Sequence, residues 1–237
     1  MQDYEGLFKK MNAVIYYSNT GQSKLIADYL SKRLEYVLIN IETNDVKKFD
    51  NLVLVFPVYC QNIPSVVKGF LSDSEIKELT VISTYGKMCP GNVLYEIQNN
   101  YKHKIVAAAY IPTKHSYIKN DVEFNEFDKL DSIIDKMKNS IEIKLPKMYK
   151  NPLSNVFPDT RSRLGLKIIR SKNCTLCGVC NLHCNYGAID CGLTNNKCIR
   201  CLKCVNVCPN KSLEVKISLP LKLYLSKKKM NKTIIYI

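Results

Sequence analysis

Residues 12–34 read NAVIYYSNTGQSKLIADYLSKRL, and this stretch decides the fold of the first half of the chain. Its opening, Asn12–Tyr17, is short, apolar and β-rich, which is typical of a buried strand. Its second part, Ser23–Leu34, places Leu25, Ile26, Tyr29, Leu30 and Leu34 on one stripe of a helix. A strand that runs through a polar loop into an amphipathic helix predicts an α/β unit.

The same alternation continues to about residue 141. Four more apolar runs predict strands: Tyr36–Ile41, Leu52–Phe56, Thr80–Ser83 and Ile105–Tyr110. Three further segments predict helices: Pro64–Leu71 with proline at the first helical position, Pro90–Asn100, and Val122–Ile141 with apolar residues at helical spacing. The connection Glu42–Asp50 has room for only one or two helical turns. Five strands that alternate with helices predict a doubly wound parallel sheet.

The loop between the first strand and its helix, Ser18–Ser23, has the composition of an anion site. It carries hydroxyl groups at positions 18, 20 and 23, and Gly21 allows close backbone approach at a helix N-terminus. It contains no lysine, and neither G-x-x-x-x-G-K-[ST] nor G-x-G-x-x-G is present. The loop therefore favours a monophosphate held by neutral donors. The alternative is an ordinary turn rich in serine and threonine.

Two further loops strengthen the case for a ligand. Pro57–Asn62 follows the third strand, and Ser83–Gly86 follows the fourth. Ligands of open α/β sheets bind beyond the carboxyl ends of the strands, and a strand order of 2-1-3-4-5 brings all three loops to that edge. Because the chain has no tryptophan, Tyr59 and Tyr85 are its best platforms for a flat aromatic ring. The alternative for each tyrosine is a core or surface position.

The second half of the chain is dominated by cysteine. Nine of the eleven cysteines follow residue 150, and Cys174, Cys177, Cys180 and Cys184 recur 24 residues later as Cys198, Cys201, Cys204 and Cys208. Each half reads C-x2-C-x2-C-x3-C, in which three cysteines wrap one corner of a cubic cluster and the fourth ligates the other cluster. The pattern predicts two [4Fe–4S] centres, one on Cys174, Cys177, Cys180 and Cys208, and one on Cys198, Cys201, Cys204 and Cys184.

Structural zinc and disulfides are the alternatives for these cysteines. Zinc sites pair two C-x2-C knuckles across a longer spacer, whereas here a third cysteine follows at once in both halves. Thiolates are the soft, anionic ligands that iron–sulfur clusters use, so the pattern favours iron. Cys191 lies outside the ligand pattern and is interpreted as a small structural residue, and His183 as a loop residue.

Charge divides the chain at the same place as cysteine. Residues 1–150 hold 20 Lys and Arg against 18 Asp and Glu, whereas residues 151–237 hold 15 against 3. We therefore predict a first domain over residues 1–145, a basic linker with three prolines over 146–170, a cluster domain over 171–216, and a basic tail over 217–237. The tail ends in a β-like stretch, Thr233–Ile237, which can pack on either domain.

These motifs resemble known families. Residues 171–216 resemble the bacterial two-cluster ferredoxin module, with Cys208-Pro209 kept and Asn185 after Cys184 as a departure. Residues 11–141 resemble a flavodoxin-like domain, with Ser23 where threonine is common. The domain order and the loop Phe56-Pro57-Val58-Tyr59 make the whole chain similar to single-chain flavodoxin–ferredoxin fusion proteins, many of them from anaerobes.

The resemblance implies FMN in the first domain and a small α+β fold for the second. The implied FMN-binding residues are Ser18, Asn19, Thr20, Gly21, Gln22 and Ser23 in the first loop, Pro57, Val58 and Tyr59 in the second, and Thr84, Tyr85 and Gly86 in the third. FMN accepts two electrons and releases them singly, whereas a [4Fe–4S] cluster carries one. The combination predicts a protein that passes electrons between FMN, the clusters and a redox partner.

Two other functions stay open. One is an FMN-dependent reductase of a small substrate, fed by the clusters. The other is a basic nucleic-acid-binding module, which the absence of any nucleic-acid motif disfavours. With no nucleophile–base pair and no hydride-donor domain, the sequence favours a carrier over a complete enzyme, and no catalytic residue is assigned.

Location and partner are expectations from composition. Residues 1–10 lack the apolar core of a secretory signal, and the longest uncharged stretch, Asn51–Val67, is too short and too polar to span a bilayer. We therefore expect a cytoplasmic protein without an integral membrane segment. Part of the basic charge of the second half would offset the clusters, and the rest would steer an acidic redox partner.

Overall fold

The computed structural model describes residues 11–118, 121–155, 158–227 and 230–237. The first module contains β1 (Asn12–Tyr16), α1 (Gln22–Leu34), β2 (Val37–Asn40), the 3-10 helix η1 (Ile41–Thr43), β3 (Lys48–Pro57), α2 (Ser65–Asp73), β4 (Glu75–Tyr85), α3 (Val93–Asn100), β5 (Ile105–Pro112), the 3-10 helix η2 (Phe127–Leu130) and α4 (Asp131–Met137). All five predicted strands are present, and η1 is the short turn expected in the second connection.

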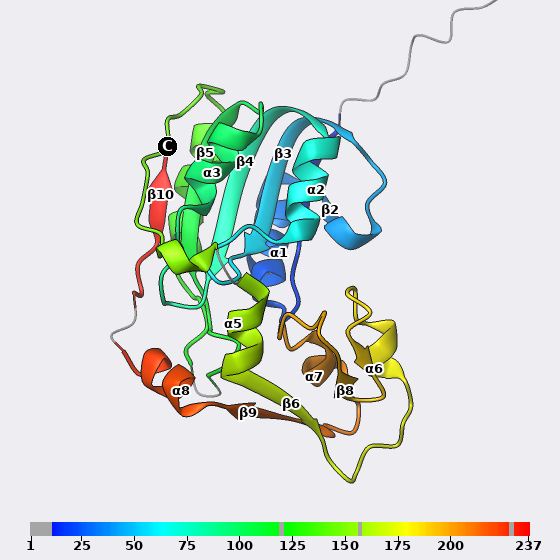
Figure 1. The fold of residues 1–237 in the computed structure, drawn as a ribbon. Coiled ribbons are helices and arrows are strands. Elements are labelled where there is room, and N and C mark those ends of the chain that lie inside the picture. The colour runs from blue at the N-terminus through cyan, green and yellow to red at the C-terminus, as the bar shows by residue number, and fades with distance from the viewer. Residues whose placement is uncertain (1–10, 119–120, 156–157, 228–229) are drawn as a thin grey trace, which may run out of the picture.

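The strands form a six-stranded sheet in the order β10-β5-β4-β3-β1-β2 (Figure 1). Strands β1 to β5 are parallel and keep the predicted order 2-1-3-4-5. The sixth strand, β10 (Ile234–Tyr236), comes from the C-terminal tail and runs antiparallel to β5. The flavodoxin-like fold class is thereby confirmed.

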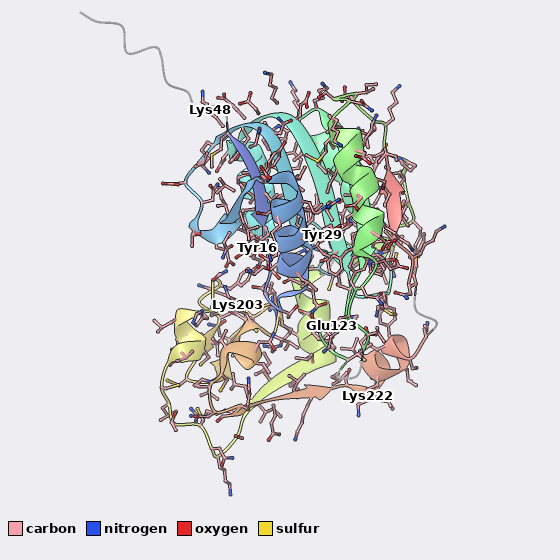
Figure 2. All side chains as sticks on the ribbon, turned by 180° about the vertical axis from the view of Figure 1, so that it is seen from behind. Tyr16, Tyr29, Lys48, Glu123, Lys203 and Lys222 are labelled. Atoms are coloured by element: carbon pink, nitrogen blue, oxygen red, sulfur yellow. The ribbon has the colours of Figure 1, made fainter. Side chains whose placement is uncertain are left out.

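Helices cover both faces of the sheet. Helices α2 and α3 lie on one face, and α1 and α4 lie on the other, which Figure 2 shows from behind. Every residue of β5 is buried. Burial on both faces explains why the strands read as apolar runs rather than as alternating patterns.

The predicted helix Val122–Ile141 is helical only in its middle part, Phe127–Met137, and is wrong at both ends. Only η2 and α4 are helical, and both ends of the predicted segment are exposed, with Val122 at 70% and Ile141 at 62%. At the N-terminal end, the backbone carbonyl of Val122 accepts a hydrogen bond from the Lys87 ammonium, which holds the segment in a loop. At the C-terminal end, Ser140 has a left-handed φ of 49°, which a right-handed helix does not allow.

Two predicted helix starts are also corrected. Pro64 has a ψ of 143° and caps α2 rather than beginning it. Pro90 has no regular structure, residues 91–92 form a turn, and α3 starts at Val93. In both cases proline precedes the helix, because its fixed φ suits the entry to a helix as well as its first position.

The second module is built from two small antiparallel sheets. After the 3-10 helix η3 (Pro152–Ser154), it contains α5 (Pro158–Gly165), β6 (Leu166–Arg170), α6 (Val179–Leu182), β7 (Ile189–Asp190), β8 (Leu193–Thr194), α7 (Lys203–Val207), β9 (Leu213–Ile217) and α8 (Leu219–Leu225). Strand β6 pairs with β9, and β7 pairs with β8. The module lies at the carboxyl end of the parallel strands (Figure 1).

The segments between the modules are ordered by contacts with the first module. The backbone N–H groups of Ile143, Leu145 and Met148 donate to Ile105, Gln98 and Asn92, respectively. Helix α5 and strand β6 lie inside the stretch predicted as a linker, so we interpret the second module as beginning near Pro158. Within the described residues, no helix is long and apolar enough to cross a membrane.

The placement of β10 makes a stability prediction. Ile235 packs against the cluster of apolar side chains between the sheet and helices α1 and α4, whereas its neighbour Ile237 is 57% exposed. We expect Ile235→Ala to lower the free energy of unfolding by about 1–2 kcal/mol, the cost of removing partly buried methyl groups. Ile237→Ala is the matched control and should change it by less than about 0.5 kcal/mol. Urea unfolding of both variants measures this, and equal effects would contradict the pairing of β10 with β5.

Candidate functional site

The loop between β1 and α1 leaves the start of a helix open. Its residue Gly21, the N-cap of α1, has a left-handed φ of 86°, and no side chain caps the helix. A glycine suits this position because other residues are strained there. The first N–H groups of a helix have no partner inside it, so an uncapped helix start presents them to an anion.

The side chains of this loop divide into two sets. Among the described residues, the hydroxyls of Ser18 and Thr20 have no hydrogen-bond partner, and both residues line a cavity. The Ser23 hydroxyl is buried and lies 2.8 Å from that of Thr84, which joins the first loop to the third. Gln22 places a buried Oε1 atom, without a described partner, at the cavity.

Asn19 connects the first loop to the second. Its Nδ2 atom donates to the hydroxyls of Tyr17 at 2.9 Å and Tyr59 at 2.6 Å. Burial raises the pKa of both tyrosines well above the usual range. Their hydroxyls are therefore neutral at physiological pH and can both accept and donate hydrogen bonds.

The loop after β3 is a tight turn in an unfavourable conformation. Tyr59 and Asn62 exchange two backbone hydrogen bonds, and the two residues between them, Cys60 and Gln61, have left-handed φ values of 49° and 65°. A left-handed residue other than glycine costs roughly 1–2 kcal/mol. Such backbone strain is typical of binding loops that their surroundings hold in place.

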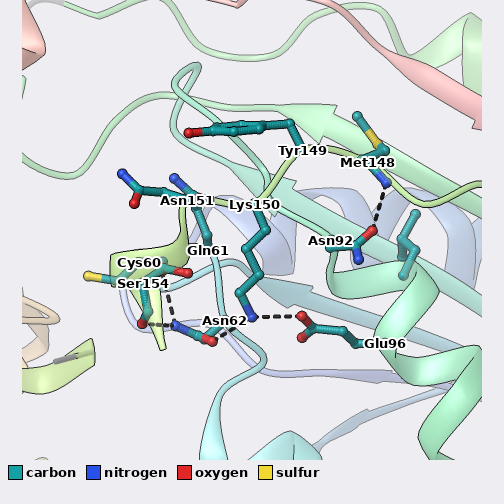
Figure 3. A network of polar contacts seen from close by, with 12 residues as sticks. Cys60, Gln61, Asn62, Asn92, Glu96, Met148, Tyr149, Lys150, Asn151 and Ser154 are labelled. Atoms are coloured by element: carbon teal, nitrogen blue, oxygen red, sulfur yellow. Dashed lines mark hydrogen bonds and ion pairs between the residues drawn. The ribbon is translucent and has the colours of Figure 1, made fainter. Parts of the chain in front are cut away.

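The segment 148–154 holds this turn (Figure 3). The Lys150 ammonium forms an ion pair with Glu96 at 2.7 Å and donates to Asn62 Oδ1 at 2.9 Å. The Asn62 amide donates to the backbone carbonyl of Ser154, and the Gln61 side chain accepts from the N–H of Asn151. The segment predicted as a linker therefore supports one of the three site loops.

The loop after β4 is fixed from the opposite side. Tyr85 is 3% exposed, its ring packs edge-on against Tyr110, and its hydroxyl donates to the Lys232 carbonyl at 2.6 Å. It therefore forms a wall of the cavity rather than an open cover. Gly86 is required here, because a Cβ atom would lie 2.5 Å from the His115 ring.

The three loops surround a cavity of about 560 Å³ that also reaches the second module. The first module contributes Ser18, Thr20, Gln22, Val58, Tyr59, Cys60, Tyr85, Gly86, His115 and Tyr117, and the second contributes Gly165, Ile199, Arg200, Cys201, Leu221 and Tyr224. This volume lies in the range of small-molecule and cofactor sites. Eleven of the twelve predicted FMN-binding residues line the cavity, and Gly21, the exception, caps the helix beside it.

The cysteine repeat has the same backbone geometry in both halves. Positive φ values recur at the 24-residue offset, as at Leu176 and Arg200 (57° and 60°) and at Gly178 and Leu202 (73° and 63°). The strand pairings are also equivalent. Arg170 pairs with Leu213, and the residues at the corresponding positions of the other half, Thr194 and Ile189, pair with each other. The sequence repeat is therefore a structural repeat with approximate two-fold symmetry.

Equivalent hydrogen bonds reach two of the predicted ligand sulfurs. The N–H of Ala188 lies 3.3 Å from Cys184 Sγ, and that of Ser212 lies 3.3 Å from Cys208 Sγ. These cysteines are the fourth of each run, which the pattern assigns to the opposite cluster. Backbone N–H groups that donate to sulfur stabilise an anionic thiolate and tune a bound cluster.

The cysteine side chains are neither paired with one another nor grouped around one point in the described residues. Among the described residues, no three or more His, Cys, Asp or Glu side chains are grouped closely enough to hold one ion. All eleven cysteines are free thiols.

Two thiols of the second run are deeply embedded. Burial raises the pKa of Cys201 to about 11 and that of Cys204 to about 12. At neutral pH both are therefore protonated in the absence of metal. Because iron binds the thiolate, a cluster assembled on these cysteines would release the two protons.

Three contacts join the modules beside the cavity. The Tyr17 and Tyr186 hydroxyls are 3.1 Å apart. The Tyr117 hydroxyl donates to the Arg200 carbonyl at 3.0 Å. Lys203 of α7 forms a half-buried ion pair with Glu42 at 2.9 Å, and Figure 2 shows it on the side of the second module that faces the first. Sequence reasoning missed Arg200, Tyr117 and Tyr186, because nothing in a single sequence shows which residues meet across a domain boundary.

Comparisons with known proteins support both modules. A family profile described as a flavodoxin domain matches residues 13–107, and one described as a 4Fe-4S binding domain matches residues 194–214. The chain thus carries an N-terminal flavodoxin domain and a C-terminal 4Fe-4S domain, which confirms the predicted resemblance to flavodoxin–ferredoxin fusion proteins. The second profile spans only the second cysteine run.

Comparisons with curated proteins and with solved structures add less than the two family profiles. No curated protein matches the sequence. The solved structures that match include a "Putative flavoprotein" from Bacteroides uniformis ATCC 8492, with 11% sequence identity and a TM-score of 0.41. That match covers 53% of this chain and 98% of the other.

The network around Lys150 generates a second prediction. The side chains of its pair with Glu96 are only 12% and 25% exposed, whereas those of the similar pair Lys138–Asp135 are 71% and 70% exposed. Lys150→Met should lower the free energy of unfolding by about 1–3 kcal/mol, because it leaves a partly buried carboxylate unpaired. The control Lys138→Met should change it by less than about 0.5 kcal/mol, as is usual for exposed pairs. Chemical denaturation compares the two, and the idea fails if both lysines prove equally dispensable.

Proposed function

We propose that this chain is an electron-transfer protein in which FMN occupies the cavity and two [4Fe–4S] clusters occupy the cysteine repeat. The flavodoxin and 4Fe-4S domains themselves support an electron-transfer role. The observation that carries the finer proposal is that Cys201, a predicted cluster ligand, lies in the wall of the same cavity as the loop Ser18–Ser23. Flavin and cluster would then be neighbours within one chain.

The cavity offers groups for each part of FMN. The phosphate would lie on the uncapped start of α1, with the hydroxyls of Ser18 and Thr20 as further donors. Gln22 Oε1 and Asn19 Oδ1, both buried acceptors without a described partner, match the hydroxyl donors of the ribityl chain. Tyr59 and Tyr85 would flank the ring, Tyr59 partly exposed and Tyr85 as part of the wall.

The two clusters would differ in depth. We assign Cys198, Cys201, Cys204 and Cys184 to an inner cluster, since Cys198 and Cys204 are buried and Cys201 reaches the cavity. We assign Cys174, Cys177, Cys180 and Cys208 to an outer cluster, since Cys177 is exposed. Electrons would pass between FMN, the inner cluster, the outer cluster and a partner, in either direction.

The chain's own residues supply position and environment. When bound, FMN would accept two electrons and release them singly, and each cluster would exchange single electrons. The contacts of Tyr17 with Tyr186 and of Lys203 with Glu42 hold the cluster module against the cavity. Asn19 donates to the hydroxyls of Tyr17 and Tyr59 and so ties the phosphate loop to the loop after β3.

An acidic redox partner fits the surface of the second module. Lys167 and Lys216 face each other across the β6–β9 ladder, and both are exposed. Like charges directly opposite each other destabilise a sheet. A basic pair kept at such a position favours a partner with negative charge, which would also be attracted at long range.

A substrate reductase is the second candidate. The cavity extends beyond the three flavin loops to an apolar wall from Leu164, Leu221 and Leu225. This extra space suits either the apolar edge of the flavin or a small substrate beside it. Turnover of an added substrate, with re-oxidation of flavin before the clusters, would favour the enzyme.

Binding of FMN is tested at Thr20. Thr20→Val keeps the shape of the side chain but removes its hydroxyl, so we expect FMN affinity to fall by about 1–3 kcal/mol. Thr20→Ser keeps the hydroxyl and should stay within about 0.5 kcal/mol of the wild type. Isothermal titration with FMN under anaerobic conditions measures both. Equal affinities for the two variants would remove Thr20 from the phosphate site.

The crossed ligand sets are tested by iron analysis. Anaerobic reconstitution should give about eight iron and eight sulfide per chain. Cys184 belongs to the first run but is assigned to the inner cluster, so Cys184→Ala should damage the inner cluster. Cys208 belongs to the second run but is assigned to the outer cluster, so Cys208→Ala should damage the outer cluster. Cys191→Ala is the control and should keep both. Stoichiometric zinc without sulfide would refute the clusters altogether.

The proposed function is tested by the kinetics of re-oxidation. The fully reduced chain is mixed rapidly with an artificial oxidant, and flavin and cluster absorbance are followed together. Because tethering makes exchange intramolecular, the flavin–cluster step should not depend on protein concentration over a tenfold range. Cys201→Ala, which removes one ligand of the proposed inner cluster, should uncouple the flavin from the outer cluster. A rate proportional to concentration would show exchange between molecules and defeat the proposal.

A further inference from the structure

Arg200 is the feature of the inter-module cavity that the proposed function does not use. It lies between Cys198 and Cys201, in the loop of the proposed inner cluster, and it lines the cavity. The residue is 9% exposed. An arginine buried to this extent needs partners for its charge and its five N–H donors.

The described residues satisfy only part of this need. The guanidinium donates through Nε to the Leu166 carbonyl at 3.0 Å, and the backbone carbonyl of Arg200 accepts from Tyr117. The buried Nη1 atom has no hydrogen-bond partner, and no carboxylate forms an ion pair with Arg200 among the described residues. The side chain is thus anchored at one nitrogen while another donor is unused.

The repeat provides an internal comparison. The position equivalent to Arg200 in the first run is Leu176, which has the same left-handed backbone and is 57% exposed. The backbone of a cluster loop therefore does not require an arginine at this position. The cation is present only in the run that meets the cavity, which argues that it serves the cavity as well as the cluster.

We propose that Arg200 is the electrostatic partner of the flavin, donating from its unused Nη1 group to the oxygen-bearing edge of the ring and stabilising the reduced form. This inference rests on the proposed function, because it needs FMN in the cavity. Reduction by two electrons from the clusters or a partner, with one proton from solvent, leaves one negative charge on the ring. A fixed guanidinium favours that charge over the neutral oxidised ring. The cluster module would thereby raise the midpoint potential of the flavin.

The experiment measures the affinity of the chain for oxidised and reduced FMN and the midpoint potential of the bound flavin, in the holoprotein with both clusters. For Arg200→Gln we expect oxidised FMN to bind within about twofold of the wild type and reduced FMN to bind about tenfold more weakly. By linkage, this corresponds to a midpoint potential lower by about 30 mV for a two-electron couple. Iron and sulfide contents verify that both clusters are retained.

Two further variants sharpen the result. Lys197→Gln removes an exposed cation next to Cys198 that does not line the cavity, so it should leave the flavin potential unchanged. Arg200→Lys keeps the charge, and reduced FMN should bind within about threefold of the wild type. It also tests the inference if Arg200→Gln does not fold.

The outcomes separate the possible failures. A flavin potential that is the same in wild type and Arg200→Gln, with a shift confined to the inner cluster, would show that Arg200 serves only the cluster and would overturn this inference alone. Equal shifts in Lys197→Gln and Arg200→Gln would overturn it as well, because any nearby charge would then suffice. A wild-type chain that binds no FMN overturns the proposed function together with the inference.

Discussion

The carboxyl edge of the parallel sheet is the constraint on which the rest of the structure depends. Five strands end there, and helix α1 begins there without a side-chain cap, so the edge is rich in unpaired backbone donors. The second module packs against this edge through Tyr186 and Lys203, which contact Tyr17 and Glu42. The cavity is therefore closed on one side by loops of the sheet and on the other by a loop of the cysteine repeat.

The course of the chain reinforces this closure. After the second module, the tail returns to the first, where Met230 donates to the Lys87 carbonyl, Lys232 accepts from Tyr85, and β10 extends the sheet. The connecting segment is bound to the first module as well, through residues 143–151. Both links thus hold the cluster module at the cavity, and an arrangement in which it swings freely toward a partner would have to break them.

The sequence was sufficient for the elements whose signals are local. Buried parallel strands read as apolar runs, and the cysteine spacing repeats at a fixed offset, so the sheet order and the repeat could be predicted. The helix Val122–Ile141 could not, because its ends are set by the contact of Lys87 with the Val122 carbonyl and by the left-handed Ser140. The same reason applies to the site. The loops of the site follow from the ends of the strands, whereas Arg200 lines the cavity and Tyr186 contacts Tyr17 only because the two modules dock.

The two cysteine runs share one backbone but have different surroundings, and this difference supports the order of the proposed centres. The run that faces the first module carries Arg200 and Lys203 where the other carries Leu176 and Val179. These cations would offset the negative charge of the proposed inner cluster in a place where little water can do so. The outer run needs no such compensation, since Cys177 is exposed, and its neighbouring Leu176 and Leu182 present apolar surface to solvent. Under the proposed function, the run beside the cavity would exchange electrons within the protein, and the other run would meet a partner from outside.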